Sequence, residues 1–348
     1  MEPTVQFDPG RCVLVLGPQI AAASLALKEL VAPAALSYGM LFEVGMQQML
    51  ELETFQSKEE KLRKQSLLAG AYELEPSFVA SKVVDSLRSH DKYDQWLSDM
   101  FNSLYNHPVQ NSPNSVAEEL KQLQEKGVLL VYTYYDMILD RAMDTVPILM
   151  EDEDVRNWGL RKTPGILHVH GVHSRSSSVM CDCVNYGKLV GETSAGRRLK
   201  EICRNRTVIF IGFDNQFYDP FLPKFASTFL SGPHLQSHST ALLLTFSGSV
   251  VNHPALLKVK LPSMVGGLSK FLVPILSPSK PGWWYTVMCV AVCVCVCVFV
   301  CVYVCVCVCV CACVCVCVCH VCDSHSSWLN VLIAQPYIQI ITVKIMLL

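Results

Sequence analysis

Two histidines near the middle of the chain have the side chains best suited to proton transfer. His168 and His170 lie two residues apart in "GILHVHG" (165–171), a short apolar run typical of a buried strand, and would share one face of that strand. An imidazole titrates near neutral pH and can act as a general base. We interpret His168 as structural. His170 is either a functional histidine or a core residue whose hydrogen bonds are satisfied.

A zinc site is the second chemistry that this region suggests. His173, Cys181 and Cys183 follow the two histidines in "HVHGVHSRSSSVMCDC". Structural zinc modules hold their ligands at short, recurring intervals, and the spacing here fits none of the common ones. We therefore expect no metal ion.

Polar and aromatic side chains follow another apolar run, in "LLVYTYYDMILD" (129–140). The run ends at Thr133, where Tyr-Tyr-Asp (134–136) precedes a helical pattern. Ligands of open α/β sheets bind outside the carboxyl ends of the strands, so these residues are candidates for a site. Asp136 can orient a ligand there, or it can cap a helix beginning at Met137.

The elements that must position these side chains alternate between strands and helices. Residues 40–110 hold several helical patterns and no strand, which predicts a helical insertion. A helix at 115–127 begins with Ser115 as its N-cap and ends at Gly127. The alternation predicts an α/β domain with a mostly parallel sheet. The predicted strands are residues 11–17, 127–133, 165–171, 207–212 and 239–246.

The segment "VLVLGPQIAAAS" has the strand, glycine turn and helix start of a phosphate-binding loop. In such a loop, backbone N–H groups at a helix N-terminus meet the phosphate. Gly17 ends the strand, but Gln19 stands where a second glycine is expected and Pro18 lacks an N–H group. The segment is therefore either a nucleotide loop or an ordinary strand-to-helix turn.

Four strand ends together resemble the sirtuin-like (silent information regulator type) NAD-binding domain, and more closely the family-with-sequence-similarity-118 proteins of animals. The resemblance runs from about residue 11 to 246 and is strongest in "VRNWGLRKTPGILHVHGVHS", "NYGKLV" (185–190) and "GVLLVYTYYDMILD". The family motifs Gly-Thr-Gly-Val-Ser, Thr-Asn-Phe/Tyr-Asp, Leu-His-Ile-His-Gly and Phe-(Leu/Ile)-Gly fall on residues 17–21, 133–136, 167–171 and 210–212.

The resemblance implies a sirtuin-type Rossmann-like fold, NAD as the cofactor, and His170 as a base near the ribose hydroxyls. It also implies a truncated domain with a bare sheet edge, because the family continues beyond about residue 250 with a strand and a helix that we do not find. The residues that it places beside the nucleotide are Gly17, Gln19, Ala21, Thr133, Tyr134, Asp136, Gly212 and Phe213.

The chain departs from the family at three of these positions. Gln19 replaces a glycine and crowds the approach of the backbone to a phosphate. Ala21 replaces a serine and lacks the hydroxyl that would cap the helix or bond the ligand. Tyr134 replaces an asparagine, lacks the paired donor and acceptor of an amide, and needs more room, so we expect it to block or reshape the nicotinamide pocket.

These departures favour a nucleotide-binding or self-assembling module with weak or no turnover. The alternative is an NAD glycohydrolase that cleaves the nicotinamide–ribose bond with His170 as base. A zinc-ribbon deacylase would need two Cys-x-x-Cys pairs, which the sequence lacks. The resemblance also implies that the chain forms homo-oligomers.

Composition limits the remaining possibilities. The net charge of −2 does not suggest a nucleic-acid partner. The N-terminus has no secretory signal, and four scattered cysteines before residue 280 suit a reducing compartment, so we expect a cytoplasmic or nuclear location. The expected divisions are a tail (1–10), the sirtuin-like domain (11–250), a divergent linker (251–286), a Val-Cys repeat (287–322) and a second tail (323–348).

The Val-Cys repeat is best explained by its codons. A (GT)n tract reads as alternating Val and Cys, so we interpret residues 287–322 as a translated microsatellite followed by non-coding sequence. A membrane segment is the alternative, because residues 287–319 carry no charge and exceed the roughly 20 apolar residues of a spanning helix. The run of thiols could also trap metal, although it lacks the polar and small residues of metallothionein-like spacing.

Overall fold

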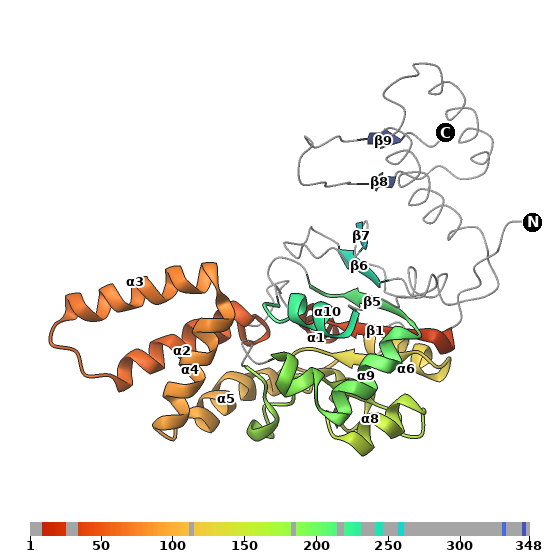
Figure 1. Cartoon of the computed structure of the whole chain (residues 1–348), viewed down its shortest axis with the longest axis horizontal. Helices are drawn as coiled ribbons and strands as arrows, with labels where there is room; N and C mark the ends of the chain where they lie inside the picture. Colours follow the sequence, from red (N-terminus) through yellow and green to blue (C-terminus); the bar gives the residue numbers. More distant parts are fainter. Residues whose placement is uncertain are drawn as a thin grey trace, which may run out of the picture. The chain divides into compact units, whose positions relative to one another are not determined.

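One parallel sheet is the centre of the fold (Figure 1). The computed structural model describes residues 9–25, 34–110, 115–181, 186–213, 219–230, 241–245, 257–260, 329–331 and 343–345. Among these residues, seven strands join in the order β3-β4-β2-β1-β5-β6-β7, and all neighbours are parallel. The strands are β1 (Cys12–Leu16), β2 (Leu129–Tyr132), β3 (Ile148–Leu149), β4 (Ile166–His168), β5 (Thr207–Ile211), β6 (Ala241–Thr245) and β7 (Leu257–Lys260).

The predicted strands form where the sequence has short, nearly continuous apolar runs. Every residue of β1, β2 and β4 is buried, as expected for strands covered on both faces. Two strands of this sheet were not predicted, β3 and β7. The sequence showed no strand beyond residue 250, but β7 pairs with β6 from Leu242↔Leu257 to Thr245↔Lys260 and forms the edge of the sheet among the described residues.

The chain runs from β1 through β2 to β3 in one direction across the sheet and returns through β4 to β7 in the other, so β1 pairs with β2 on one side and with β5 on the other. Two groups of helices pack among themselves, α1 with α6 and α7, and α9 with α8 and α10. Right-handed crossovers in these two directions place the two groups on opposite faces. Their bounds are α1 (Pro18–Ser24), α6 (Val116–Glu125), α7 (Ile138–Met143), α8 (Asp152–Gly159), α9 (Ser194–Arg204) and α10 (Leu222–Leu230).

The helical insertion predicted near 40–110 is confirmed. Figure 1 shows it in orange beside the sheet. Its interior is aromatic, with Phe42, Trp96 and Phe101 fully buried. The helices are α2 (Tyr38–Leu52), α3 (Lys58–Leu74), α4 (Pro76–Ser89) and α5 (Tyr93–Asn102).

The helix predicted at 115–127 also has the expected ends. The hydroxyl oxygen of Ser115 accepts a hydrogen bond from the Glu118 N–H (3.3 Å), and Gly127 adopts φ +93°, which favours glycine. Shorter helical turns occur at η1 (Pro9–Arg11), η2 (Ala34–Leu36), η3 (Ser103–Asn106), η4 (Ser176–Ser178) and the π-helical η5 (Gly187–Gly191).

The chain divides into two units, and residues Asp8–Ser269 form the one that contains the sheet. In the other unit, β8 (Leu329–Val331) and β9 (Val343–Ile345) pair antiparallel. The described ranges contain no helix long and apolar enough to cross a membrane. The Val-Cys repeat lies outside these ranges.

Candidate functional site

The carbonyl group of Thr133, just after β2, joins three segments of the chain. It accepts hydrogen bonds from the Tyr38 hydroxyl (2.6 Å) and from Nδ1 of His170 (2.5 Å). Because a carbonyl oxygen only accepts, Nδ1 of His170 must carry the proton. Nε2 is then the acceptor for the Tyr186 hydroxyl, 3.1 Å away. Both ring nitrogens of His170 are therefore engaged within the protein.

His170 has no exposed surface and is surrounded by rings. Its ring centroid lies 5.3 Å from that of Phe221 and 5.6 Å from that of Tyr186. Burial lowers the pKa of His170 to about 4, and the Thr133 carbonyl opposes this shift. The imidazole is consequently neutral at pH 7, which is the form a general base requires, but a substrate cannot reach it without movement of its neighbours.

Tyr134, at the family's asparagine position, is also fully buried. Its hydroxyl donates to the Ala35 carbonyl oxygen (2.7 Å), and its ring packs edge-on against Tyr38 with centroids 4.6 Å apart. Phe101 closes the other side at 5.8 Å. The side chain therefore occupies the space between the end of β2 and the segment that begins α2.

Asp136 bonds to the backbone at the start of α7, just before its N-cap residue Met137. Its Oδ1 accepts from the Ile138 N–H (2.7 Å), and its Oδ2 accepts from the Tyr132 hydroxyl. The helix begins at Ile138 rather than at Met137. Burial raises the pKa of Asp136 to about 6, while the bonds from Tyr132 and Ile138 act in the opposite direction. Both carboxylate oxygens are thus used inside the segment 132–138.

His168 is structural, as interpreted from the sequence. Its Nε2 lies 2.8 Å from Oδ2 of Asp140, and both side chains are buried. β4 ends at His168, and the Gly171 N–H then bonds to the His168 carbonyl oxygen, so the strand expected to reach residue 171 is too long. His168 and His170 consequently have different partners rather than a shared face.

The described residues contain no group of three or more His, Cys, Asp or Glu side chains that could hold a metal ion. Cys183 lies outside these residues.

The glycine turn after β1 is closed by backbone contacts. The Gly17 N–H bonds to the Ile211 carbonyl oxygen (2.8 Å), and the Gln19 N–H bonds to that of Gly212 (3.3 Å). The Ile20 N–H turns back to the Gly17 carbonyl oxygen (3.1 Å), and Pro18 has no N–H. In this arrangement the first turn of α1 offers no N–H group to a phosphate.

Gly17 and Gly212 are glycines because the two strand ends nearly touch. A Cβ on Gly17 would lie 2.2 Å from the Gly212 carbonyl oxygen, and one on Gly212 would lie 2.7 Å from Cγ1 of Ile20. Phe213, fully buried, packs beside the same contact. Ala21 is the fourth residue of α1, so its position cannot cap the helix, contrary to one of our two expectations.

The predicted residues therefore separate into three groups. Thr133, Tyr134 and His170 lie together in an aromatic cluster, and the glycine-turn residues form a second contact with Gly212 and Phe213. Asp136 belongs to the start of α7. Because the turn's N–H groups are engaged and the cluster is filled with rings, the residues in this conformation do not fit a bound dinucleotide.

Sequence reasoning missed three aromatic residues of this region, and Asp219 lies beside them. Tyr38 contacts the cluster from the start of α2, Phe221 contacts it from the turn just before α10, and Tyr186 covers Nε2 of His170. Asp219 is buried, its Oδ1 accepts from the Phe221 N–H (2.7 Å), and its Oδ2 has no hydrogen bond among the described residues. Tyr186 lies in the motif "NYGKLV", whereas Tyr38, 95 residues from Thr133, has no local signal.

The strand order, with β1 between β2 and β5, defines a Rossmann-like α/β domain. Residues 92–246 match the family model of the SIR2-like domain. The chain thus carries a sirtuin-like domain, an NAD-related fold. The match begins at residue 92, after β1 and its glycine turn. These two elements are part of the same sheet, because β1 pairs with β2 and with β5.

Proposed function

We propose that the sirtuin-like domain of this chain is a degenerate module that turns over NAD weakly or not at all. The observation that carries this proposal is the position of Tyr134, whose ring fills the space beside Thr133 and whose hydroxyl bonds to the Ala35 carbonyl oxygen. An asparagine there would leave room and offer an amide donor and acceptor. A buried phenol with its donor already used can do neither.

NAD is the nucleotide that the fold favours, and we propose that its binding is weak because the site must first open. Tyr38, Tyr134 and Phe213 are each at most 1% exposed. Rings packed in this way contribute dispersion and hydrophobic stabilisation that a ligand has to replace. A protein whose binding-competent state is rarely populated binds with an affinity reduced by that fraction.

An NAD glycohydrolase with His170 as base is the second candidate. The neutral state of the imidazole at pH 7 supports it, since a base must be unprotonated. The attacking hydroxyl would have to replace Tyr186 at Nε2. This candidate therefore requires that Tyr186 and Tyr134 both move when NAD binds.

We also propose that the chain is closely related to the family-with-sequence-similarity-118 proteins. The role that we propose for a module without turnover is self-association. Self-association is supported by α3, because none of the described side chains of this helix is buried. Leu62, Leu67 and Leu74 on this helix are 52%, 65% and 89% exposed. Apolar side chains gathered on one exposed helix are typical of an interaction surface.

The test measures NAD binding to the full chain by titration calorimetry, for the wild type and for Tyr134→Asn, Tyr134→Phe and Tyr135→Asn. We expect Tyr134→Asn alone to bind NAD more tightly than the wild type, because it alone opens the space beside Thr133. Tyr134→Phe keeps the ring, and Tyr135→Asn makes the same change one residue away. Equal affinity for the wild type and Tyr134→Asn, with both proteins folded by circular dichroism, would contradict the proposal.

A further inference from the structure

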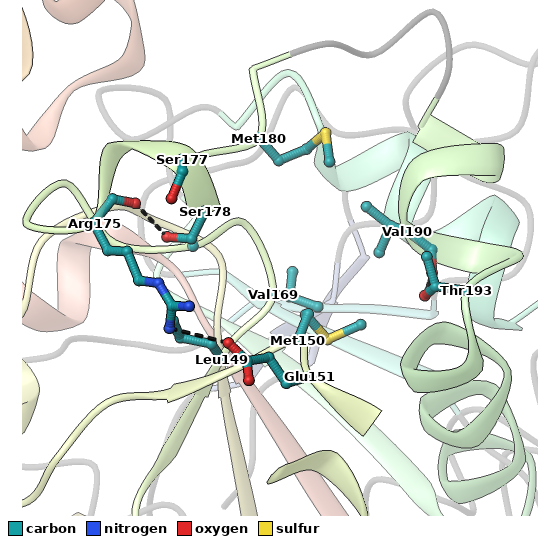
Figure 2. Close-up of a pocket in the computed structure, with 11 residues that line it drawn as sticks. Leu149, Met150, Glu151, Val169, Arg175, Ser177, Ser178, Met180, Val190 and Thr193 are labelled. Atoms are coloured by element: carbon teal, nitrogen blue, oxygen red, sulfur yellow. Dashed lines mark hydrogen bonds and ion pairs between the residues drawn. The ribbon is translucent and has the colours of Figure 1, made fainter. Parts of the chain in front are cut away.

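A pocket of about 270 Å³ lies beside the aromatic cluster but is not part of it. Val169 and Gly171, the two neighbours of His170, line it, whereas His170 does not (Figure 2). The other walls come from the end of β3, the loop 175–180 and the start of α9. Nothing in the nucleotide chemistry above uses this space, so its ligand has to be deduced from its own lining.

The wall formed by residues 171–180 is held in place by hydrogen bonds. Gly171 adopts φ +80°, and a Cβ there would lie 2.0 Å from the Ser178 carbonyl oxygen. The Ser178 hydroxyl oxygen accepts from the Val172 N–H (3.1 Å), and the hydroxyl donates to the Arg175 carbonyl oxygen (2.6 Å). The Met180 N–H bonds to the His170 carbonyl oxygen (2.9 Å). The pocket is therefore preformed, which lowers the cost of binding.

Part of the pocket's lining is apolar. Leu149, Val169 and Val190 are buried residues of this part, and Met150 and Met180 complete it, whereas Ser177, Ser178 and Thr193 are the uncharged polar lining residues. In Figure 2 the side chains of Met180 and Val190 lie across the opening from Val169 and Met150. Methionine side chains adapt to the shape of an apolar group, so the apolar part of the lining suits a flexible aliphatic or thioether chain.

One ion pair forms the charged part of the rim. Nη1 of Arg175 lies 3.0 Å from Oε1 of Glu151, and the two side chains are 59% and 54% exposed. Glu151 precedes α8 but does not cap it with its side chain. The carboxylate is instead turned to the arginine at the edge of the pocket, as Figure 2 shows.

We propose that this pocket binds a free α-amino acid with an apolar side chain. The ligand's carboxylate would pair with Arg175, its ammonium group would pair with Glu151, and its side chain would enter the space between Val169 and Met180. A zwitterionic ligand would replace the ion pair between Arg175 and Glu151 with two ion pairs, one to each of these side chains. An anion alone would instead repel Glu151, and a cation alone would repel Arg175.

The size of the pocket agrees with this class of ligand. Pockets for drug-sized ligands and cofactors have volumes of roughly 300–1,000 Å³, and this pocket is slightly smaller. A bound amino acid would also touch the backbone on both sides of His170. The proposal does not depend on NAD binding, because no residue of the aromatic cluster takes part in it.

The experiment titrates the full chain with L-leucine and L-methionine by calorimetry. The matched probes are N-acetyl-L-leucine, which lacks the ammonium group, L-leucinamide, which lacks the carboxylate, and glycine, which lacks the side chain. We expect leucine or methionine to bind at least about tenfold more tightly than any of the three, because each lost charged hydrogen bond or buried side chain is worth about 1.5–3 kcal/mol.

Two substitutions at the rim, Arg175→Gln and Glu151→Gln, are each expected to weaken leucine binding about tenfold or more. Arg156→Gln and Glu153→Gln are the controls, because that exposed pair lies 3.8 Å apart on α8 and does not line the pocket. The double variant Glu151→Arg with Arg175→Glu reverses the pair and should recover part of the affinity.

Three results would overturn the proposal. The first is no heat from leucine or methionine up to about 10 mM. The second is binding of N-acetyl-L-leucine or L-leucinamide within about twofold of leucine. The third is an equal loss of affinity in the rim variants and in the Arg156→Gln and Glu153→Gln controls. All substituted side chains are exposed, so thermal unfolding should show the variants to be folded.

Discussion

Nδ1 of His170 donates a hydrogen bond to the carbonyl oxygen of Thr133, 2.5 Å away. This bond leaves Nε2 as the basic nitrogen, and Tyr186 covers it. The carbonyl also accepts from Tyr38, so one backbone atom links the histidine to the first helix of the insertion. The histidine that we propose as a base is thus neutral at pH 7, but the surrounding side chains enclose it.

Asp219 makes stability depend on pH. Burial raises the pKa of Asp219 from an ordinary value near 4 to about 7. Its favourable contribution to the unfolding free energy is therefore complete below about pH 4 and is lost as the pH rises towards 7. Asp219→Asn keeps an oxygen for the Phe221 N–H and cannot ionise. We expect the variant's unfolding free energy, relative to wild type, to rise from pH 5 to pH 8, by at most about 1.4 kcal/mol per pH unit.

Denaturant unfolding at several pH values measures this difference. Two other buried groups also change the unfolding free energy with pH. The raised pKa of Asp136 acts in the same direction as that of Asp219, and the lowered pKa of His170 acts in the opposite direction. Both effects are present in variant and wild type, so they cancel in the difference. A difference that stays constant between pH 5 and pH 8 would show that Asp219 is ionised throughout.

The contact between Gly17 and Gly212 predicts a large effect of a single methyl group. Gly17→Ala would place Cβ 2.2 Å from a backbone oxygen, so β1 and β5 would have to separate. We expect a loss of at least about 3 kcal/mol in unfolding free energy. Gly70→Ala is the control, because Gly70 lies in α3 with no atom within 4 Å of the added Cβ, and it should stabilise the helix by about 0.5–1 kcal/mol.

Short apolar runs in the sequence predicted much of the sheet, because strands that are buried on both faces consist mainly of apolar residues. Five apolar runs became strands, and the Ser115 cap formed as expected. β3, with two residues, is too short to give a periodic signal. The sequence also located Thr133, Tyr134 and His170 correctly at strand ends.

Local sequence patterns could not predict which side chains fill the site. Tyr38 reaches Thr133 across 95 residues, and no local pattern specifies which distant ring will pack there. The sequence indicated that Tyr134 needs more room than asparagine, but not that its hydroxyl would bond to Ala35. Likewise, the sequence left the Gly17 turn as either a nucleotide loop or an ordinary strand-to-helix turn, and the close approach of Gly17 to Gly212 emerges only when β1 and β5 pair.

Self-association through α3 can be tested by adding charge to its exposed face. We expect Leu67→Glu and Leu74→Glu to shift the full chain towards monomer in sedimentation velocity, because each removes an exposed apolar side chain and adds repulsion between copies. Leu160→Glu is the control, since Leu160 is 57% exposed but lies outside α3. A monomeric wild type, or an equal effect of all three variants, would exclude α3 as the interface.

The most direct test of the closed site is the rate of nicotinamide release from NAD by the full chain and by its His170→Ala variant. The account predicts that the two rates are indistinguishable, because Tyr134 and Tyr186 keep the substrate from the imidazole. Nicotinamide release by the wild type that is abolished in His170→Ala would contradict it, and would show that the aromatic cluster opens far enough for His170 to act as a base.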